Sequence, residues 1–371
     1  MKYLAVLGRQ PKISLAEIEA VFSDIERSTN KVCIFDVSDK IPDINRLGGV
    51  MKMAVELENK PLEYLKELPE GKITFGISDY SKNASKRSVI SEALKIKKIL
   101  VRHGRNVRVV ENNDVVIPTA TAIHNGISGR NIKKVEFIKF EDSWYKVIGV
   151  QDIDAYTKRD RMRPARDARV GMLPPKLAQI LINLCGDLSE GATILDPFCG
   201  TGVVLQEALL MGYKAYGTDL SEKMVEYTEK NLNWLTNLRE FSLDLDEFKV
   251  SQGDATSFKW QKPIDAVACE GYLGRPMSKV PSDIDFKKEK QECAAIVIGF
   301  LKNLLPQIEA ETPVTIAVPA WLRESGEYSR LEILDEIETM GYNVNNKSRE
   351  GLLYYREGQI VARDIIILRK K

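Results

Sequence analysis

The chain has 371 residues, which is too long for one ordinary hydrophobic core, so we expect two or three domains of roughly 100–200 residues. Hydrophobic residues make up 44% of the sequence and charged residues 29%, a balance that excludes disordered and fibrous proteins. The net charge is only +1, so any affinity for nucleic acid must come from local basic patches.

The residue types also limit the chemistry. No apolar run approaches the roughly 20 residues that a membrane helix needs, so we expect a cytoplasmic protein without a membrane partner. The five cysteines never form a C-x-x-C pair, which argues against zinc ribbons and disulfide frameworks. The only histidines are His103 and His124, which nearly excludes a histidine-rich metal centre. The sequence therefore favours chemistry that needs neither histidine nor metal.

Residues 1–65 are predicted to form a small domain of a sheet and a helix. Ser14 is followed three residues later by Glu17, the pattern of a capping box at the start of a helix. Apolar residues at helical spacing continue from there. The expected elements are strands at 3–7, 31–37 and 51–57 and a helix at 14–22.

Residues 66–150 are again mixed, with strands expected at 72–77 and 106–110 and a helix at 89–101. Nine basic residues and one acid, Glu92, lie between Lys82 and Arg108. A merely solvated helix face normally mixes charges of both signs, so we interpret this run as a surface for RNA phosphates. The residues expected to contact RNA here are Lys82, Lys86, Arg87 and Lys97.

Residues 151–170 are predicted to be a linker. Six basic and two acidic residues lie between Lys158 and Arg169, and such a segment is not expected to bury a face. We count Arg159 and Arg163 among the expected RNA contacts.

Residues 171–371 alternate strands and helices, which predicts parallel βαβ units and a doubly wound, mostly parallel α/β sheet. A helix with proline in its first turn opens this part. Ligands of such sheets bind beyond the carboxyl ends of the strands. Strands are expected at 193–195, 214–218, 266–269, 314–318 and 360–368, and helices near 202–211, 221–236, 285–305 and 329–340.

The run from Ile194 to Gly202 reads Ile-Leu-Asp-Pro-Phe-Cys-Gly-Thr-Gly, an apolar strand followed by a glycine turn and a helix. Glycines let the backbone approach a ligand closely, and the helix start offers free N–H groups. A P-loop would need Gly-Lys-Ser/Thr, and a dinucleotide site would need G-x-G-x-x-G, and neither is present. The acid that ends the strand suits the cationic amino acid part of S-adenosylmethionine (SAM). The expected cofactor contacts here are Asp196, Phe198, Gly200, Thr201 and Gly202.

Two further acids follow the next two strands. Asp219 closes the second strand, where a carboxylate is able to accept both ribose hydroxyls, although capping of the next helix is an alternative role. Asp254 follows the expected third strand and is a candidate acceptor for the adenine amine. Three acids at three successive strand ends, together with the glycine turn, predict SAM binding.

These motifs resemble a known family. Arg159-Asp160, Arg163-Pro164 and the stretch 171–178, leading to Asp196–Gly202, are similar to the THUMP-containing tRNA guanosine-10 N2-methyltransferases of archaea and eukaryotes. The ending from Tyr355 to Arg363 is similar to the last hairpin of that family. The match in the first domain is one of pattern only.

The resemblance implies an order of parts and an activity. Residues 1–65 would form a ferredoxin-like domain, 66–150 a THUMP-like RNA-binding domain, 151–170 a linker and 171–371 a Rossmann-like methyltransferase domain. The implied enzyme is a SAM-dependent tRNA methyltransferase that acts on the exocyclic N2 of a guanosine, with tRNA as its partner.

One departure from the family concerns the loop after the fourth strand. The family carries Asp-Pro-Pro-Tyr there, whereas this chain reads Ala-Cys-Glu-Gly-Tyr-Leu-Gly-Arg-Pro over 268–276. If Tyr272 takes the aromatic position, Cys269 stands where the acid should be; if Glu270 is the acid, Leu273 stands at the aromatic position. Glycines 271 and 274 would allow a shift of register, so we assign Glu270 as acceptor of the amine hydrogens and Tyr272 as the stacking ring.

The cysteines near this site have two interpretations. Cys269 would suit a thiolate that adds to a pyrimidine, but nothing nearby in sequence lowers its pKa, so an inert buried thiol is favoured. Cys199, within the glycine turn, is interpreted as a small packing residue.

Two classes of function therefore compete. The first is the tRNA methyltransferase described above, and the second is a SAM- and tRNA-binding protein with weak or no transfer activity, suggested by the altered loop. Adenine-N6 methylation of nucleic acid is a further alternative, because it uses a similar acceptor loop.

Overall fold

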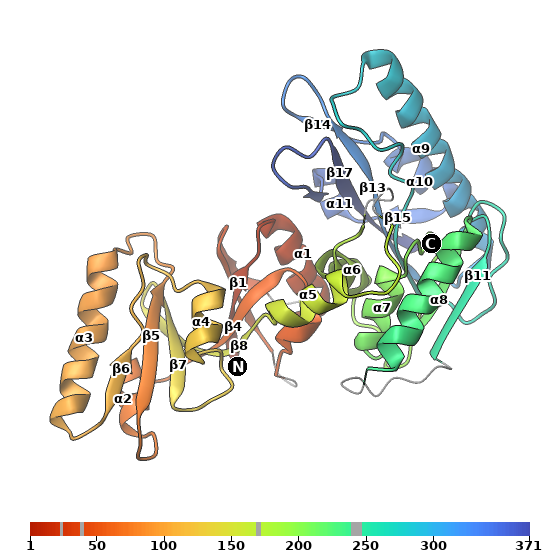
Figure 1. Ribbon diagram of the computed structural model, residues 1–371. Coiled ribbons are helices and arrows are strands. Elements are labelled where there is room, and N and C mark those ends of the chain that lie inside the picture. Colours follow the sequence, from red (N-terminus) through yellow and green to blue (C-terminus); the bar gives the residue numbers. More distant parts are fainter. Residues whose placement is uncertain (23–24, 38–40, 168–171, 239–246) are drawn as a thin grey trace. The chain divides into compact units, whose positions relative to one another are not determined.

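The computed structural model describes residues 1–22, 25–37, 41–167, 172–238 and 247–371. The chain divides into two units, Met1–Asp152 and Ile153–Lys371, and each unit contains its own sheet (Figure 1). Residues 168–170 of the expected linker lie outside the described residues.

The described part of the first unit has an eight-stranded sheet in the order β2-β3-β1-β4-β8-β7-β5-β6. Strand β5 pairs in parallel with β6 and β7, and the other pairs are antiparallel. Because β4 pairs with β8, residues 1–65 and 66–150 contribute strands to the same sheet. The strands are β1 (Lys2–Leu7), β2 (Ile25–Ser28), β3 (Val32–Asp36), β4 (Val50–Glu56), β5 (Ile73–Asp79), β6 (Val107–Val109), β7 (Lys134–Phe140) and β8 (Ser143–Val150).

Helix α3 (Lys86–Arg102) carries the basic run expected from the sequence. Ser85 caps it, since its hydroxyl accepts a hydrogen bond from the Ser88 amide at 3.1 Å. Val89, Ala93, Ile96 and Leu100 recur at helical spacing and pack into a cluster with strand residues such as Phe75 and Phe137. The lysines of α3 consequently lie on its other faces. The remaining helices of this unit are α1 (Pro11–Phe22), α2 (Pro61–Lys66) and α4 (Thr119–Asn125).

The predicted capping box at Ser14 and Glu17 is wrong. Helix α1 starts at Pro11, so Ser14 lies inside the helix and its hydroxyl donates to the Gln10 carbonyl at 3.2 Å. Proline suits a first helical turn because amides there have no acceptor within the helix, so its lack of an N–H costs no hydrogen bond. Glu17 is fully buried and instead accepts the amides of Gly48 and Gly49 at 2.9 and 2.8 Å.

The second unit confirms the doubly wound, mostly parallel Rossmann-like sheet. The main path of its sheet is β11-β10-β9-β12-β13-β17-β15. The strands from β11 to β13 run parallel and β17 is antiparallel, so the order reverses between β9 and β12. The strands are β9 (Thr193–Asp196), β10 (Lys214–Asp219), β11 (Phe248–Gln252), β12 (Ala266–Glu270), β13 (Pro313–Leu322), β14 (Tyr328–Ser329), β15 (Tyr342–Val344), β16 (Leu353–Tyr354) and β17 (Val361–Lys370).

Helices connect these strands close to the predicted positions. They are α6 (Pro175–Asn183), α7 (Val203–Leu210), α8 (Glu222–Thr236), α9 (Asp283–Leu304), α10 (Leu334–Met340) and α11 (Asn346–Glu350). Helix α10 begins later than expected, because Tyr328–Ser329 pairs with β13 as β14.

The expectation that the segment 151–170 buries no face is wrong for its described part. Ile153–Arg161 forms helix α5, and Tyr156, Arg159 and Arg163 are all buried in the second unit. The Tyr156 hydroxyl donates to Gln179 of α6, and the Arg159 guanidinium stacks over the Tyr156 ring at 4.5 Å. Two basic residues of this segment, Arg159 and Arg163, are thus buried inside the second unit, whereas Arg161 and Arg166 are exposed.

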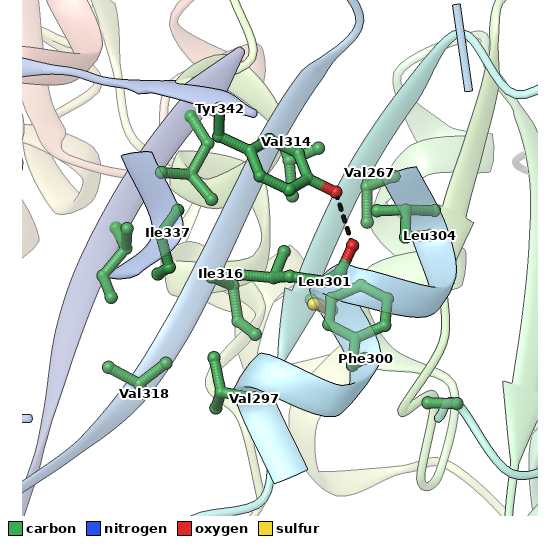
Figure 2. Packing of buried hydrophobic residues seen from close by; sticks show 14 of the residues in the cluster. Val267, Val297, Phe300, Leu301, Leu304, Val314, Ile316, Val318, Ile337 and Tyr342 are labelled. Atoms are coloured by element: carbon green, nitrogen blue, oxygen red, sulfur yellow. Dashed lines mark hydrogen bonds between the residues drawn. The ribbon is translucent and has the colours of Figure 1, made fainter. Parts of the chain in front are cut away.

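Figure 2 shows the main core of the second unit, where α9 packs on β12 and β13. Val297, Phe300 and Leu301 of α9 meet Ile316 of β13, and the Tyr342 hydroxyl donates to the Leu301 carbonyl at 2.9 Å (Figure 2). Side chains alternate along a strand, so Thr315, Ala317 and Pro319 lie on the face opposite α9.

Candidate active site

Three carboxylates end three adjacent strands at one edge of the second sheet. Asp196 ends β9, Asp219 ends β10 and Glu270 ends β12, and β9 lies between the other two strands. Parallel strands present their carboxyl ends at the same edge, beside the point where the strand order reverses. The fold therefore brings together acids that are up to 74 positions apart in the sequence.

The glycine turn leaves β9 in a conformation that depends on glycine. Gly200 has φ 53° and Gly202 has φ 81°, both in the left-handed region. A Cβ added to Gly202 would lie 2.8 Å from the Thr228 methyl group. Gly202 also precedes the first residue of α7, and no side chain caps that helix. The turn thus presents uncapped amides next to the three strand ends.

Two side chains of helix α8 donate hydrogen bonds to the backbone of the turn. The Thr228 hydroxyl donates to the Gly200 carbonyl and the Asn231 amide donates to the Thr201 carbonyl, each at 2.8 Å. Asn231 and Thr228 are almost fully buried. These bonds fix the backbone of the turn. They were not predictable, because in the sequence both residues occupy ordinary helix positions.

The Asp219 carboxylate supports both the glycine turn and Ser221, the N-cap residue of α8. Its Oδ1 accepts the Ser221 amide at the start of α8, and its Oδ2 accepts the Gly200 amide, each at 2.9 Å. A carboxylate has about four acceptor positions, so further hydrogen bonds remain possible. The structure thus assigns Asp219 a supporting role that is compatible with a ribose contact.

Asp254 follows β11 and is exposed. Its Oδ1 accepts the amide and the hydroxyl of Thr256 at 2.8 and 2.7 Å, and these bonds lower the pKa of Asp254. Phe198, another of the predicted cofactor contacts, packs edge-on against Phe300 of α9 with ring centroids 5.2 Å apart. Its amide donates to Asp196 Oδ1 at 3.1 Å.

Asp196 has the most unusual electrostatic environment of the three acids. It is 2% exposed, and burial raises its pKa well above the ordinary value, with further increases from Asp219 and Glu270. A buried carboxylate that is flanked by two others attracts a cation, because a positive group would offset both burial and repulsion. The site therefore favours a positively charged ligand.

Glu270 ends β12, the strand that pairs with β9, and forms an ion pair with Arg363 of β17. Burial raises the pKa of Glu270, and the Arg363 guanidinium acts in the opposite direction. The sequence marked Arg363 only as part of the last motif and gave it no function. Residues 93 positions apart gave no local pattern that would have paired them.

Tyr272 lies two residues beyond Glu270, and its side chain lies on the α9 side of the sheet. Its ring packs against the core cluster of α9, and burial followed by Glu292 and Glu289 raises the pKa of its hydroxyl. Within the described part of the chain, no hydrogen bond or ring contact joins Tyr272 to Glu270. The loop is fixed at Gly274, with φ 83°, and Glu289 accepts the next amide, that of Arg275, at 3.2 Å.

The cysteines of the site are buried thiols. Cys269 is fully buried, and burial followed by Asp196 raises its pKa well above the ordinary value. Cys199 is 4% exposed, and burial and Asp196 raise its pKa in the same way. A thiolate nucleophile is therefore disfavoured at both positions.

The predicted RNA contacts separate into two groups. Lys82, Lys86 and Arg87 are exposed and Lys97 is half-buried, all on α3 or just before it. Arg159 and Arg163 are instead buried inside the second unit.

The buried arginines support the glycine turn and its helix. Arg159 contacts both carboxylate oxygens of fully buried Glu207 on α7, at 2.8 and 3.2 Å. Arg163 donates to the Thr201 hydroxyl at 3.2 Å. A guanidinium held in this way is not available to RNA phosphates, so we replace the expected RNA contacts of these two residues by a structural role.

Two absences concern only the residues that the structure describes. They contain no group of three or more side chains arranged to hold a metal ion. No helix among them is long and apolar enough to cross a membrane.

Known proteins resemble parts of this chain. Residues 163–292 match the family model of the RMKL-like methyltransferase domain. The tRNA (guanine(10)-N2)-dimethyltransferase of Pyrococcus abyssi is 32% identical over 177 residues, which are 46% of this chain and 44% of the relative. The protein of the same name from Methanothermobacter thermautotrophicus is 38% identical over 104 residues, 28% of either chain. The alignments thus span less than half the length of these relatives.

Among solved structures, TrmN from Thermus thermophilus is similar over 100% of both chains, at 16% identity and a TM-score of 0.48. The methyltransferase domain expected from the sequence is confirmed by the family model, and the resemblance to the guanosine-10 enzymes is confirmed over the aligned residues.

Proposed function

We propose that this chain, which carries an RMKL-like methyltransferase domain over residues 163–292, transfers a methyl group from SAM to the exocyclic N2 of a guanosine in tRNA. The convergence of Asp196, Asp219 and Glu270 around the glycine turn carries this proposal. The names of the relatives support guanosine as the acceptor.

The residues at the turn fit SAM. Asp196 is a buried acid whose raised pKa suits a cationic partner, such as the amino group of the cofactor. The uncapped start of α7 and the glycines let a ligand approach the protein backbone closely. Asp219 would accept the ribose hydroxyls and Asp254 the adenine amine. When bound, SAM supplies an electrophilic methyl group.

Glu270 is the acceptor for the hydrogens of the target amine. An exocyclic guanine amine is a poor nucleophile, because its lone pair is delocalised into the ring. A carboxylate that accepts an amine hydrogen directs that lone pair and stabilises the positive charge that develops as the methyl arrives. Tyr272, whose ring packs against the α9 core, would have to turn towards Glu270 to stack on the base. Most of the rate would come from holding donor and acceptor close and aligned.

The first unit supplies the RNA contacts in this proposal. Lys82, Lys86 and Arg87 are exposed, and phosphate contacts from such side chains position a nucleic acid without reading its sequence. We retain the THUMP-like interpretation of residues 66–150, the ferredoxin-like interpretation of 1–65 and the cytoplasmic location as parts of the same proposal.

The binding-only function is the main competitor, because the acceptor loop departs from Asp-Pro-Pro-Tyr. An experiment with tRNA from a strain that lacks the gene separates the two. The full chain is incubated with this tRNA and methyl-labelled SAM, and the nucleosides are analysed by mass spectrometry. We expect label in N2-methylguanosine. Binding of both ligands without any transfer would favour the binding-only function, and label in N6-methyladenosine would favour the adenine alternative.

A further inference from the structure

Arg363 reaches Glu270 across an intervening strand. In the sheet, β13 lies between β12 and β17, with Glu270 opposite Ala317 and Arg363 opposite Pro319. Adjacent strands are about 4.8 Å apart, so the ion pair bridges two strand spacings, roughly 10 Å. Directly opposed residues share one face of a sheet, so the arginine crosses β13 on the face that Ala317 and Pro319 occupy.

Small side chains on β13 make this crossing possible. Ala317 and Pro319 are compact, and both lie on the face opposite the α9 core. The same face carries Asp196 at the end of β9, whose neighbour Leu195 belongs to the α9 core. The Arg363–Glu270 pair and Asp196 therefore lie together on one side of the sheet.

The charges around Glu270 are unbalanced without the arginine. The two side chains of the pair are only 7% and 15% exposed. Asp196 faces Glu270 from β9, with Asp219 of β10 beyond it, and the neighbouring Cys269 adds a thiol. Arg363 of β17 is the cation that acts on Glu270 in this group. Without it, burial and the neighbouring acid would favour the protonated form of Glu270.

We propose that Arg363 is a positioning residue for methyl transfer, which holds Glu270 Oε1 through its Nε–H and keeps the carboxylate ionised beside Asp196. This inference rests on the proposed function. Oε2 is then left to accept a hydrogen from the target amine. A protonated Glu270 would offer a donor where the amine needs an acceptor.

The test compares Arg363→Met and Arg363→Lys with a matched control, Arg330→Met. Arg330 pairs with Asp364, the next residue of β17, whose side chain alternates to the other face of the strand. For Arg363→Met we expect a loss of transfer on the order of 10²-fold near neutral pH, as when one transition-state hydrogen bond is removed. As the pH is lowered, we also expect this variant to lose activity at a higher pH than the parent, because Glu270 protonates more easily without the arginine.

The other variants distinguish charge from a general structural effect. Arg363→Lys should keep the pH dependence of the parent and part of its rate. Arg330→Met should lose thermal stability but keep the parental pH dependence. Ala317→Leu, which changes no charge, should block the crossing and reproduce the pH shift of Arg363→Met. SAM affinity, measured by calorimetry, should stay within about twofold in all four variants if only the acceptor is disturbed.

The inference and the proposed function fail in different ways. A parent that transfers no methyl overturns the proposed function, and the Arg363–Glu270 pair is then tested by a double-mutant cycle of thermal unfolding with Glu270→Gln. Coupled melting temperatures support the pair, and additive ones contradict it. A parent that transfers normally, alongside an Arg363→Met variant with parental rate and pH dependence, overturns the positioning role alone.

Discussion

The Asp219 carboxylate accepts the Gly200 amide at 2.9 Å, which ties the end of β10 to the turn that follows β9. The same carboxylate accepts a hydrogen bond from the amide of Ser221, the N-cap residue of α8. One acid thus joins a strand, a turn and a helix at the edge of the sheet where the ligand is expected.

This relationship predicts a graded response to substitution. Asp219→Ala loses the support of the turn and the ribose acceptor, and should weaken SAM binding by about 1–3 kcal/mol. Asp219→Asn keeps one acceptor oxygen and should lose less. Calorimetry with SAM or its demethylated product measures both. Tight nicotinamide binding without a SAM signal would contradict the cofactor assignment.

Asp196 predicts an opposition between stability and binding. Its folded-state pKa is raised, so above its ordinary value of 3.8 the folded state keeps a proton that the unfolded chain releases. Folding stability is therefore lost as the pH rises from 3.8 through the raised pKa of Asp196 in the folded state. Asp196→Asn removes that loss and still accepts the Phe198 amide. We expect it to melt at a higher temperature than the ligand-free parent near neutral pH, with the difference shrinking in acid, while SAM binding weakens.

A melting temperature of Asp196→Asn below that of the parent at every pH would contradict the claim that burial and neighbouring acids raise the pKa of Asp196. The ligand-free protein is the form to compare, because SAM would stabilise the parent by mass action.

The basic residues of α3, of which Lys86 and Arg87 are exposed and Lys97 is half-buried, predict salt-dependent tRNA binding. Replacing Lys86, Arg87 and Lys97 by alanine should weaken binding and flatten its dependence on salt, because fewer counterions are released. A matched control replaces Arg9, Lys12 and Lys31, which are exposed in the same unit and remove the same charge. Equal losses for the two triple variants would show that only total charge matters.

The acceptor loop predicts opposite results for two adjacent residues. Glu270→Ala should lose about 10²–10³-fold in turnover, and Glu270→Gln should keep part of it. Cys269→Ala should retain transfer, since burial raises the pKa of this thiol, at a stability cost of about 0.5–3 kcal/mol for a core truncation. Loss of transfer only in Cys269→Ala would place the acceptor in the other register of the loop.

Local patterns predicted those parts of the site that local chemistry determines. The strand from Thr193, the glycine turn and the acids at 196 and 219 were recognisable because turn glycines and strand-end acids have fixed spacings. The doubly wound sheet followed from the alternation of strands and helices.

Contacts between distant segments were not predictable in this way. The sequence predicts Arg159 as an RNA contact, and its burial depends instead on Glu207, 48 positions later. The Arg363–Glu270 pair depends on β17 lying two strands from β12, which requires the sheet order. The difference at Ser14 has a local cause, because Pro11 is the first residue of α1 and moves the helix start three residues earlier.

Methyl transfer to the exocyclic N2 of guanosine requires that amine, so the decisive experiment removes it from the substrate. A tRNA transcript with inosine in place of guanosine has the same ring and lacks the exocyclic amine. With methyl-labelled SAM, we expect label in the guanosine transcript and none in the inosine transcript, while the inosine transcript, refolded and checked by melting, still binds. Equal labelling of the two transcripts would show that N2 of guanosine is not the methylated atom.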